Sequence, residues 1–142
     1  MNPPDERSFE ARLTSLGDVV AFVEAACAGH GIERQAALRL VFVVEELFTN
    51  TVQHGHGGDC ASAVTLALAF PPGAIALDYA DSAPPYNPLE HFHSGPVANA
   101  ENATLRPAGG LGVYVTGQLV ETGSYRREHG RNLLHLRLPR GA

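Results

Sequence analysis

Apolar residues between positions 38 and 54 recur every three or four residues, the spacing of the buried face of an α-helix. The stripe consists of Leu40, Val41, Val44, Leu47, Phe48, Thr51 and Val52, and Phe42 and Val43 widen it. Glu46, Asn50 and His54 stand four residues apart, so they share one ridge of this helix. The ridge has two interpretations: a solvent-exposed polar face that ends in a Gly55 cap, or a set of functional side chains.

The same reasoning predicts three helices and five strands along the chain. In order, they are an edge strand at 8–14, a helix that begins after Ser15 and stops at Gly29, the long helix at 33–53, a hairpin of strands 62–70 and 74–79, a helix at 111–120, and a hairpin of strands 123–128 and 132–138. The glycines at 54–59 predict a mobile turn. Residues 84–108 are rich in proline and lack apolar periodicity, so we expect a lid at about 89–108. These elements predict one domain, 1–142, an α+β two-layer sandwich with three helices on one face of a mostly antiparallel sheet.

Composition narrows the classes of function. The 142 residues include 44% apolar and 18% charged side chains, as in soluble globular proteins. A net charge of -5 disfavours nucleic acid as a direct partner. No apolar run approaches the ~20 residues of a membrane helix, and the N-terminus has no export signal. Cys27 and Cys60 are expected to be free thiols of a cytoplasmic protein.

Every basic residue of the chain is arginine, because the sequence contains no lysine. A P-loop needs its lysine, and a protein-kinase fold needs a strand lysine on the phosphates of ATP. Both are therefore excluded. If the protein binds ATP, it has to hold the phosphates with backbone amides, a metal ion and arginine.

Two segments downstream of the long helix add to the pattern. Residues 81–88 read Asp-Ser-Ala-Pro-Pro-Tyr-Asn-Pro, and residues 109–114 read Gly-Gly-Leu-Gly-Val-Tyr. With the helix, these segments resemble the ATP-binding domain of the GHKL superfamily, which has the histidine-kinase-like (Bergerat) fold. The resemblance covers about 10–138 and is strongest to the anti-sigma factors that are also serine kinases.

The resemblance assigns roles to residues of the long helix and of the segment after it. Glu46 matches the general base, and Asn50 matches the Mg²⁺ ligand, since an amide oxygen is a hard ligand. His54, one turn further, is placed on the phosphate side of the pocket or is a polar residue near a helix end. Asp81 matches the residue that accepts a hydrogen bond from the adenine amino group, with Asp78 as a rival for that role.

The family pattern has a glycine where this chain has Ala83, a departure that puts nucleotide affinity in doubt. The glycine-rich segment is expected to cradle phosphate at a helix N-terminus through Gly109, Gly110, Leu111 and Gly112. Arg106, just before it, is expected to bring positive charge to the γ-phosphate.

The resemblance implies an anti-sigma factor that uses ATP and Mg²⁺ to phosphorylate a serine on a small antagonist protein and so controls release of a sigma factor. It also implies a homodimer. The alternative is a catalytically silent ATP-binding module that sequesters a partner. A third possibility is a metal-dependent enzyme, whose ligands would be His54, His56, Asp59 and Cys60, or His91 with His93.

Overall fold

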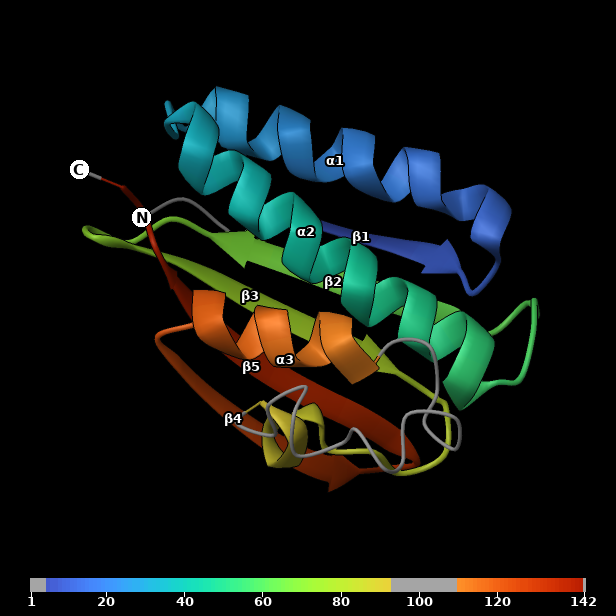
Figure 1. Ribbon diagram of the computed structural model, residues 1–142. Helices are drawn as coiled ribbons and strands as arrows, with labels where there is room; N and C mark the ends of the chain where they lie inside the picture. The colour runs from blue at the N-terminus through green and yellow to red at the C-terminus, as the bar shows by residue number, and fades with distance from the viewer. Residues whose placement is uncertain (1–4, 93–109, 142) are drawn as a thin grey trace.

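The protein folds as one antiparallel sheet with its helices on a single face (Figure 1). The computed structural model describes residues 5–92 and 110–141. The strands are β1 (Asp5–Glu10), β2 (Ala63–Ala69), β3 (Ala74–Asp81), β4 (Thr122–Glu128) and β5 (Arg131–Pro139), in the order β1-β2-β3-β5-β4 across the sheet. The helices are α1 (Leu16–Gly29), α2 (Arg34–Asn50) and α3 (Gly110–Leu119), with short helical segments η1 (Leu13–Ser15), η2 (Thr51–Gly55) and η3 (Pro88–His91). The predicted α+β class, with about five strands and three helices, is confirmed.

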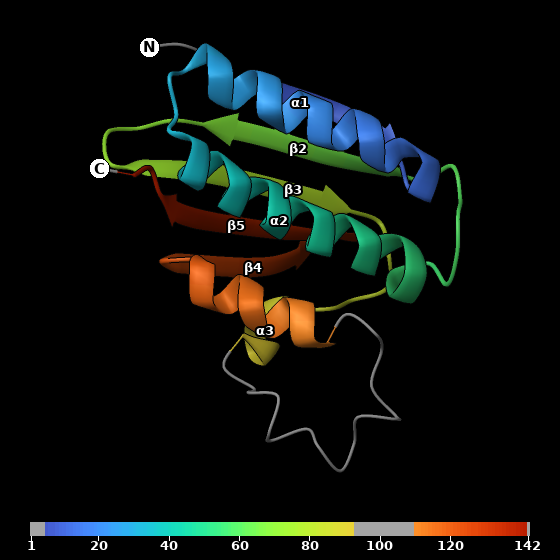
Figure 2. The ribbon, with the colours of Figure 1, turned by 45° about the horizontal axis from the view of Figure 1, so that its top comes forward.

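The core lies between the helices and the inner face of the sheet. Alternate residues of β2, β3 and β5 are buried, as expected for strands with one covered face. Figure 2 shows the three helices lying across this face, with α3 beside β4 and α1 toward the opposite edge of the sheet. The largest fully buried side chains include Phe48, Leu40, Leu66, Leu136 and Val23, so both α1 and α2 contribute to one continuous core.

The first strand differs from its prediction at both ends. β1 covers Asp5–Glu10 and pairs with β2 as an edge strand, so the edge position is confirmed and the range 8–14 is wrong. Phe9 and Ala11 are buried as the alternation predicts. Leu13 is 41% exposed, because the chain turns into η1 and its strand periodicity no longer applies.

The predicted long helix changes its hydrogen-bond pattern at Thr51. α2 ends at Asn50 and η2 continues it as a π-helical turn, in which the His56 N–H donates to the carbonyl of Thr51 at 2.9 Å. The Thr51 hydroxyl lies 3.0 Å from the carbonyl of Leu47, one turn earlier, an arrangement that tends to bend helices. Gly55 does not have positive φ, so it is not the predicted cap; Gly57 is the next residue with positive φ.

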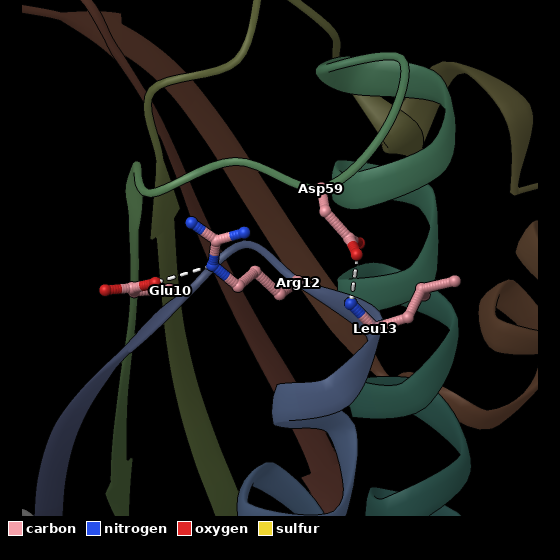
Figure 3. A network of polar contacts seen from close by, with 4 residues as sticks. All are labelled: Glu10, Arg12, Leu13 and Asp59. Carbon is pink, nitrogen blue, oxygen red and sulfur yellow. Dashed lines mark hydrogen bonds and ion pairs between the residues drawn. The ribbon is translucent and has the colours of Figure 1, made fainter.

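The glycine-rich segment after η2 is anchored to the beginning of the chain (Figure 3). Oδ1 of Asp59 accepts a hydrogen bond from the Leu13 N–H at 2.9 Å, beside an ion pair between Arg12 and Glu10. The Cys60 N–H donates to the carbonyl of Ala11, also at 2.9 Å. These bonds fix the end of the turn at 54–59, which its composition predicts to be mobile.

Both cysteines are free thiols, as predicted. Cys27 is buried, and burial, with a smaller contribution from the charge of Glu24, raises the pKa of its thiol to about 11. The thiol is therefore protonated at neutral pH. Within residues 5–92 and 110–141, no helix is both long and apolar enough to cross a membrane.

Candidate functional site

A cavity of about 430 Å³ opens between α2, η2, the end of β3 and α3. Its wall is mostly apolar, with a few polar groups, as is usual for sites that bind small molecules. The residues that line it are Leu47, Asn50, Thr51, His54, Gly55, Tyr79, Asp81, Ala83, Pro84, Pro85, Tyr86, Pro88, His91, Val113, Tyr125, Asn132 and Leu134.

Asp81 is the buried acid of this cavity, with 6% of its surface exposed. Its Oδ2 accepts from the Thr51 hydroxyl at 2.8 Å, and its Oδ1 accepts from Nδ2 of Asn132 at 2.8 Å. The Ala83 N–H also lies 3.2 Å from Oδ1. Three donors on one carboxylate fix its orientation, and the carboxylate keeps acceptor capacity for a ligand.

A second hydroxyl orients Thr51. The Tyr79 OH lies 2.6 Å from Oγ1 of Thr51. Burial raises the pKa of Tyr79 well above its ordinary value, the bond to Thr51 opposes that shift, and the charge of Asp81 adds to it. The phenol therefore stays protonated, and its O–H is able to donate a hydrogen bond to Oγ1 of Thr51. The Thr51 hydroxyl has one hydrogen and lies within bonding distance of both Asp81 and the Leu47 carbonyl. Thr51, in η2, therefore links Tyr79 and Asp81 of β3 to Leu47 of α2.

The rival carboxylate, Asp78, lies on the opposite face of the sheet. Its Oδ1 is 2.7 Å from Nδ1 of His135, and its side chain is 66% exposed. Asp78 does not line the cavity, so the geometry favours Asp81 for recognition of a ligand.

Ala83, the departure from the family pattern, lies directly against Gly55. A methyl group placed on Gly55 would come within 2.8 Å of the Ala83 Cβ, closer than side chains tolerate. The segment that carries Gly55 and the segment that carries Ala83 thus meet at the cavity wall, and the space between them holds one methyl group but not two. The glycine of the His-Gly pair therefore accommodates the alanine, and the cavity persists with Ala83 in place.

This contact predicts a reciprocal pair of substitutions. Gly55→Ala is expected to lower the free energy of unfolding by about 1–3 kcal/mol, since two methyl groups would overlap. Adding Ala83→Gly should restore most of that loss, a coupling that a double-mutant cycle of denaturant unfolding measures. Gly17→Ala is the control, because nothing lies within 4 Å of a Cβ there. Additive effects of the two substitutions would contradict the proposed contact.

Glu46 lies outside the cavity wall, against the first turn of α3. A Cβ on Gly112 would overlap the carboxylate of Glu46, so only glycine fits there without displacing that group. The first turn of a helix favours a nearby negative charge. Desolvation, and then the charge of Glu45, raise the pKa of Glu46. A raised pKa suits a general base that works near neutral pH.

Asn50 and His54 both line the cavity, one turn and two turns after Glu46. Asn50 forms no side-chain hydrogen bond with any other residue in the described part of the chain, and its side chain borders the cavity. One hard oxygen ligand beside a cavity fits Mg²⁺, which keeps most of its coordination for water and phosphate.

The glycine-rich segment is only partly described. Gly110 and Leu111 contribute backbone to the first turn of α3, and Gly112 contacts Glu46. The roles predicted for Gly109 and Arg106 lie outside the described residues, as does most of the expected lid. Between Leu89 and Phe92, the described start of that lid contains the end of η3.

The third possibility, a metal-dependent enzyme that uses these histidines, gains no support from the described residues. No group of three or more histidine, cysteine or acidic side chains in 5–92 and 110–141 could hold a metal ion. Asp59 is bonded to the chain at Leu13, and the ring of His91 stacks on Tyr86 at 5.4 Å. His93 lies outside the described residues.

Sequence reasoning missed three residues of the site. The sequence pattern places Thr51 in the buried stripe of a helix, Tyr79 in a strand and Asn132 at the start of the last strand, without indicating a role in the site. A polar residue within a buried stripe was the available signal for Thr51, because a buried hydroxyl needs a partner. Nothing in the sequence placed Asn132 beside Asp81, since only strand pairing joins them.

An antiparallel sheet with helices on one face, and a buried acid in a mostly apolar cavity beside the second helix, define an α+β domain with a site for a small molecule. Residues 9–138 match the family described as the histidine kinase-like ATPase domain, and the chain belongs to that family. A search of curated proteins found no match.

Proposed function

We propose that this ATP-binding domain is an anti-sigma factor with serine-kinase activity, which phosphorylates a serine of a small antagonist protein. The observation that carries the nucleotide-binding part is the buried carboxylate of Asp81 at the cavity, held by Thr51 and Asn132. The anti-sigma and kinase parts rest on the sequence resemblance, which spans the helix and both downstream segments.

The adenine ring would lie in the apolar cavity with its amino group toward Asp81. A fixed carboxylate accepts from that amino group, whereas guanine has a carbonyl at the corresponding position. Leu47, Val113 and Leu134 supply apolar wall around the ring. The site therefore favours ATP over GTP.

In the proposed reaction, the serine oxygen attacks the γ-phosphorus and the bond to the ADP oxygen breaks. Glu46 accepts the hydroxyl proton, and Asn50 would hold Mg²⁺ together with phosphate oxygens. Bound Mg²⁺ would neutralise charge on the phosphates. The first turn of α3 offers N–H groups to phosphate, and Arg106 is proposed to add the positive charge that lysine supplies in other folds.

Partner proteins are proposed to dock on the outer side of α1 and α2. Between these helices is a small depression of about 190 Å³, lined by Glu24, Cys27, Ala28, Ile32, Arg34, Ala37, Leu38 and Val41. Leu38 is 50% exposed, an apolar side chain that a sigma factor or antagonist would cover. A homodimer is also proposed, and it rests on the sequence resemblance alone.

One observation favours the alternative, a silent ATP-binding module that sequesters a partner. The Glu46 carboxylate packs on α3 and does not form part of the cavity wall. Catalysis requires this carboxylate to reach the serine hydroxyl beside the phosphates, and a module without chemistry has no such requirement.

Thermal unfolding with nucleotides tests the binding proposal. ATP with Mg²⁺ is expected to raise the melting temperature more than GTP, as a ligand at a hundredfold excess over Kd stabilises by about 2.7 kcal/mol. Transfer of labelled phosphate to an antagonist serine then separates the kinase from the silent module. A chain stabilised by neither ATP nor ADP would contradict both.

A further inference from the structure

Two side chains of the β4–β5 hairpin hold the segment that follows Asp81. Nη1 of Arg127 donates to the carbonyl of Ala83 at 2.7 Å. Nδ2 of Asn132 lies 3.1 Å from that same carbonyl and 3.1 Å from the carbonyl of Pro84, in addition to its bond with Asp81. Donors from two neighbouring strands therefore converge on one short stretch of backbone.

Asn132 uses both ends of its amide. Its Oδ1 accepts from the Tyr125 OH at 2.6 Å and lies 3.2 Å from the Tyr86 N–H. The residue is 7% exposed and occupies the strand position paired with Asp81. A buried amide with every group bonded fixes its neighbours, because any shift leaves a polar group without a partner.

The held segment is the one in which this chain departs from its family's pattern. Ala83 contributes a methyl group where the pattern has glycine, and that methyl contacts Gly55 on one side. On the other side, the Ala83 carbonyl accepts from Arg127 and Asn132. Residue 83 is thus held between η2 and the hairpin. Because the Ala83 N–H contacts the Asp81 carboxylate, these contacts also hold that carboxylate in place.

We infer that Arg127 and Asn132 are positioning residues that set the preference of this site for adenine over guanine nucleotides. The inference rests on the proposed function, in which Asp81 recognises the adenine amino group. A hydrogen bond weakens steeply when its angle or distance departs from the optimum, so a segment free to shift would weaken the contact to adenine. GTP gains little from Asp81, and its affinity should therefore depend little on Arg127.

Arg127→Gln tests this with a matched control on the same strand. Arg126 is adjacent in sequence, points to the opposite face of β4, is 71% exposed and pairs with Glu128 at 3.0 Å. Calorimetric titration of the full chain with ATP and with GTP, both in Mg²⁺, should show about a tenfold weaker Kd for ATP in Arg127→Gln and an unchanged Kd for GTP. Arg126→Gln should change neither Kd.

Asn132→Leu is the second variant, similar in size to the original and uncharged, but lacking its N–H donors. It should lower the ratio of ATP to GTP affinity further, in protein that thermal unfolding shows to be folded. Equal losses for ATP and GTP in Arg127→Gln, or no loss, would overturn the inference while leaving ATP binding established. If the unmodified chain bound no ATP, the proposed function would fall and this inference with it.

Discussion

Replacing Glu46 with alanine is expected to lower the rate of phosphate transfer to serine by about 10²–10⁴-fold, the usual contribution of a positioned acid–base group. Affinity for ATP should stay the same or rise, because the carboxylate acts on the proton of the nucleophile and does not line the cavity. Rates at saturating ATP, measured beside the Kd for ATP, separate the two effects.

Neighbours on the same helix provide the controls for Glu46. Asn50→Ala should lose both tight ATP·Mg²⁺ binding and turnover, since it removes the proposed metal ligand. Glu45→Ala should keep the maximal rate. Because the charge of Glu45 helps to raise the pKa of Glu46, its removal lowers that pKa, and the acid limb of the pH–rate profile should move to lower pH. Transfer by Glu46→Ala at the unmodified rate would show that Glu46 is not the base.

Asp81→Asn is expected to weaken ATP binding on the order of 100-fold and to abolish the preference for ATP over GTP. The carboxylate accepts from Thr51, Asn132 and the backbone, so an amide at this position would bring two hydrogens toward existing donors. It could also turn a donor toward the adenine amino group. Competition between ATP and GTP for a fluorescent adenine nucleotide measures both effects.

Asp78→Asn is the control for Asp81, because it makes the same change on the same strand but on the outer face of the sheet. That variant should bind both nucleotides as the unmodified chain does. Equal affinity of the unmodified chain for ATP and GTP would remove Asp81 from the role of adenine acceptor.

The sheet and helices could be predicted because local patterns determine them. β2 and β5 alternate between buried and less buried residues over nearly their whole length, and the stripe through Leu40, Val44 and Phe48 is continuous. The His129-Gly130 turn was predictable from its glycine, which tolerates the positive φ that the short hairpin requires; the positive φ of His129 was not predicted.

The site was less predictable, because its geometry depends on contacts between distant segments. Asp81 was identified from the residues that follow it, but its partner Asn132 is fifty-one positions away along the chain. The effect of Ala83 could not be judged from the sequence, since its accommodation depends on the space beside Gly55. Likewise, i and i+4 spacing placed Glu46 beside Asn50 but could not show that its carboxylate lies against Gly112.

The π-helical turn at Thr51–Gly55 shifts the phase of every residue after Asn50 relative to an uninterrupted α-helix. It behaves as a one-residue insertion whose extra position is absorbed in the helix itself. Gln53 is exposed, so its removal would delete no buried group. Such a deletion would convert the turn to α-helical spacing and leave Gly55 one turn after Asn50, still facing Ala83. The stretch can therefore lose one residue and keep its contact with Ala83, whereas an added residue or a second deletion would turn Gly55 away from that alanine.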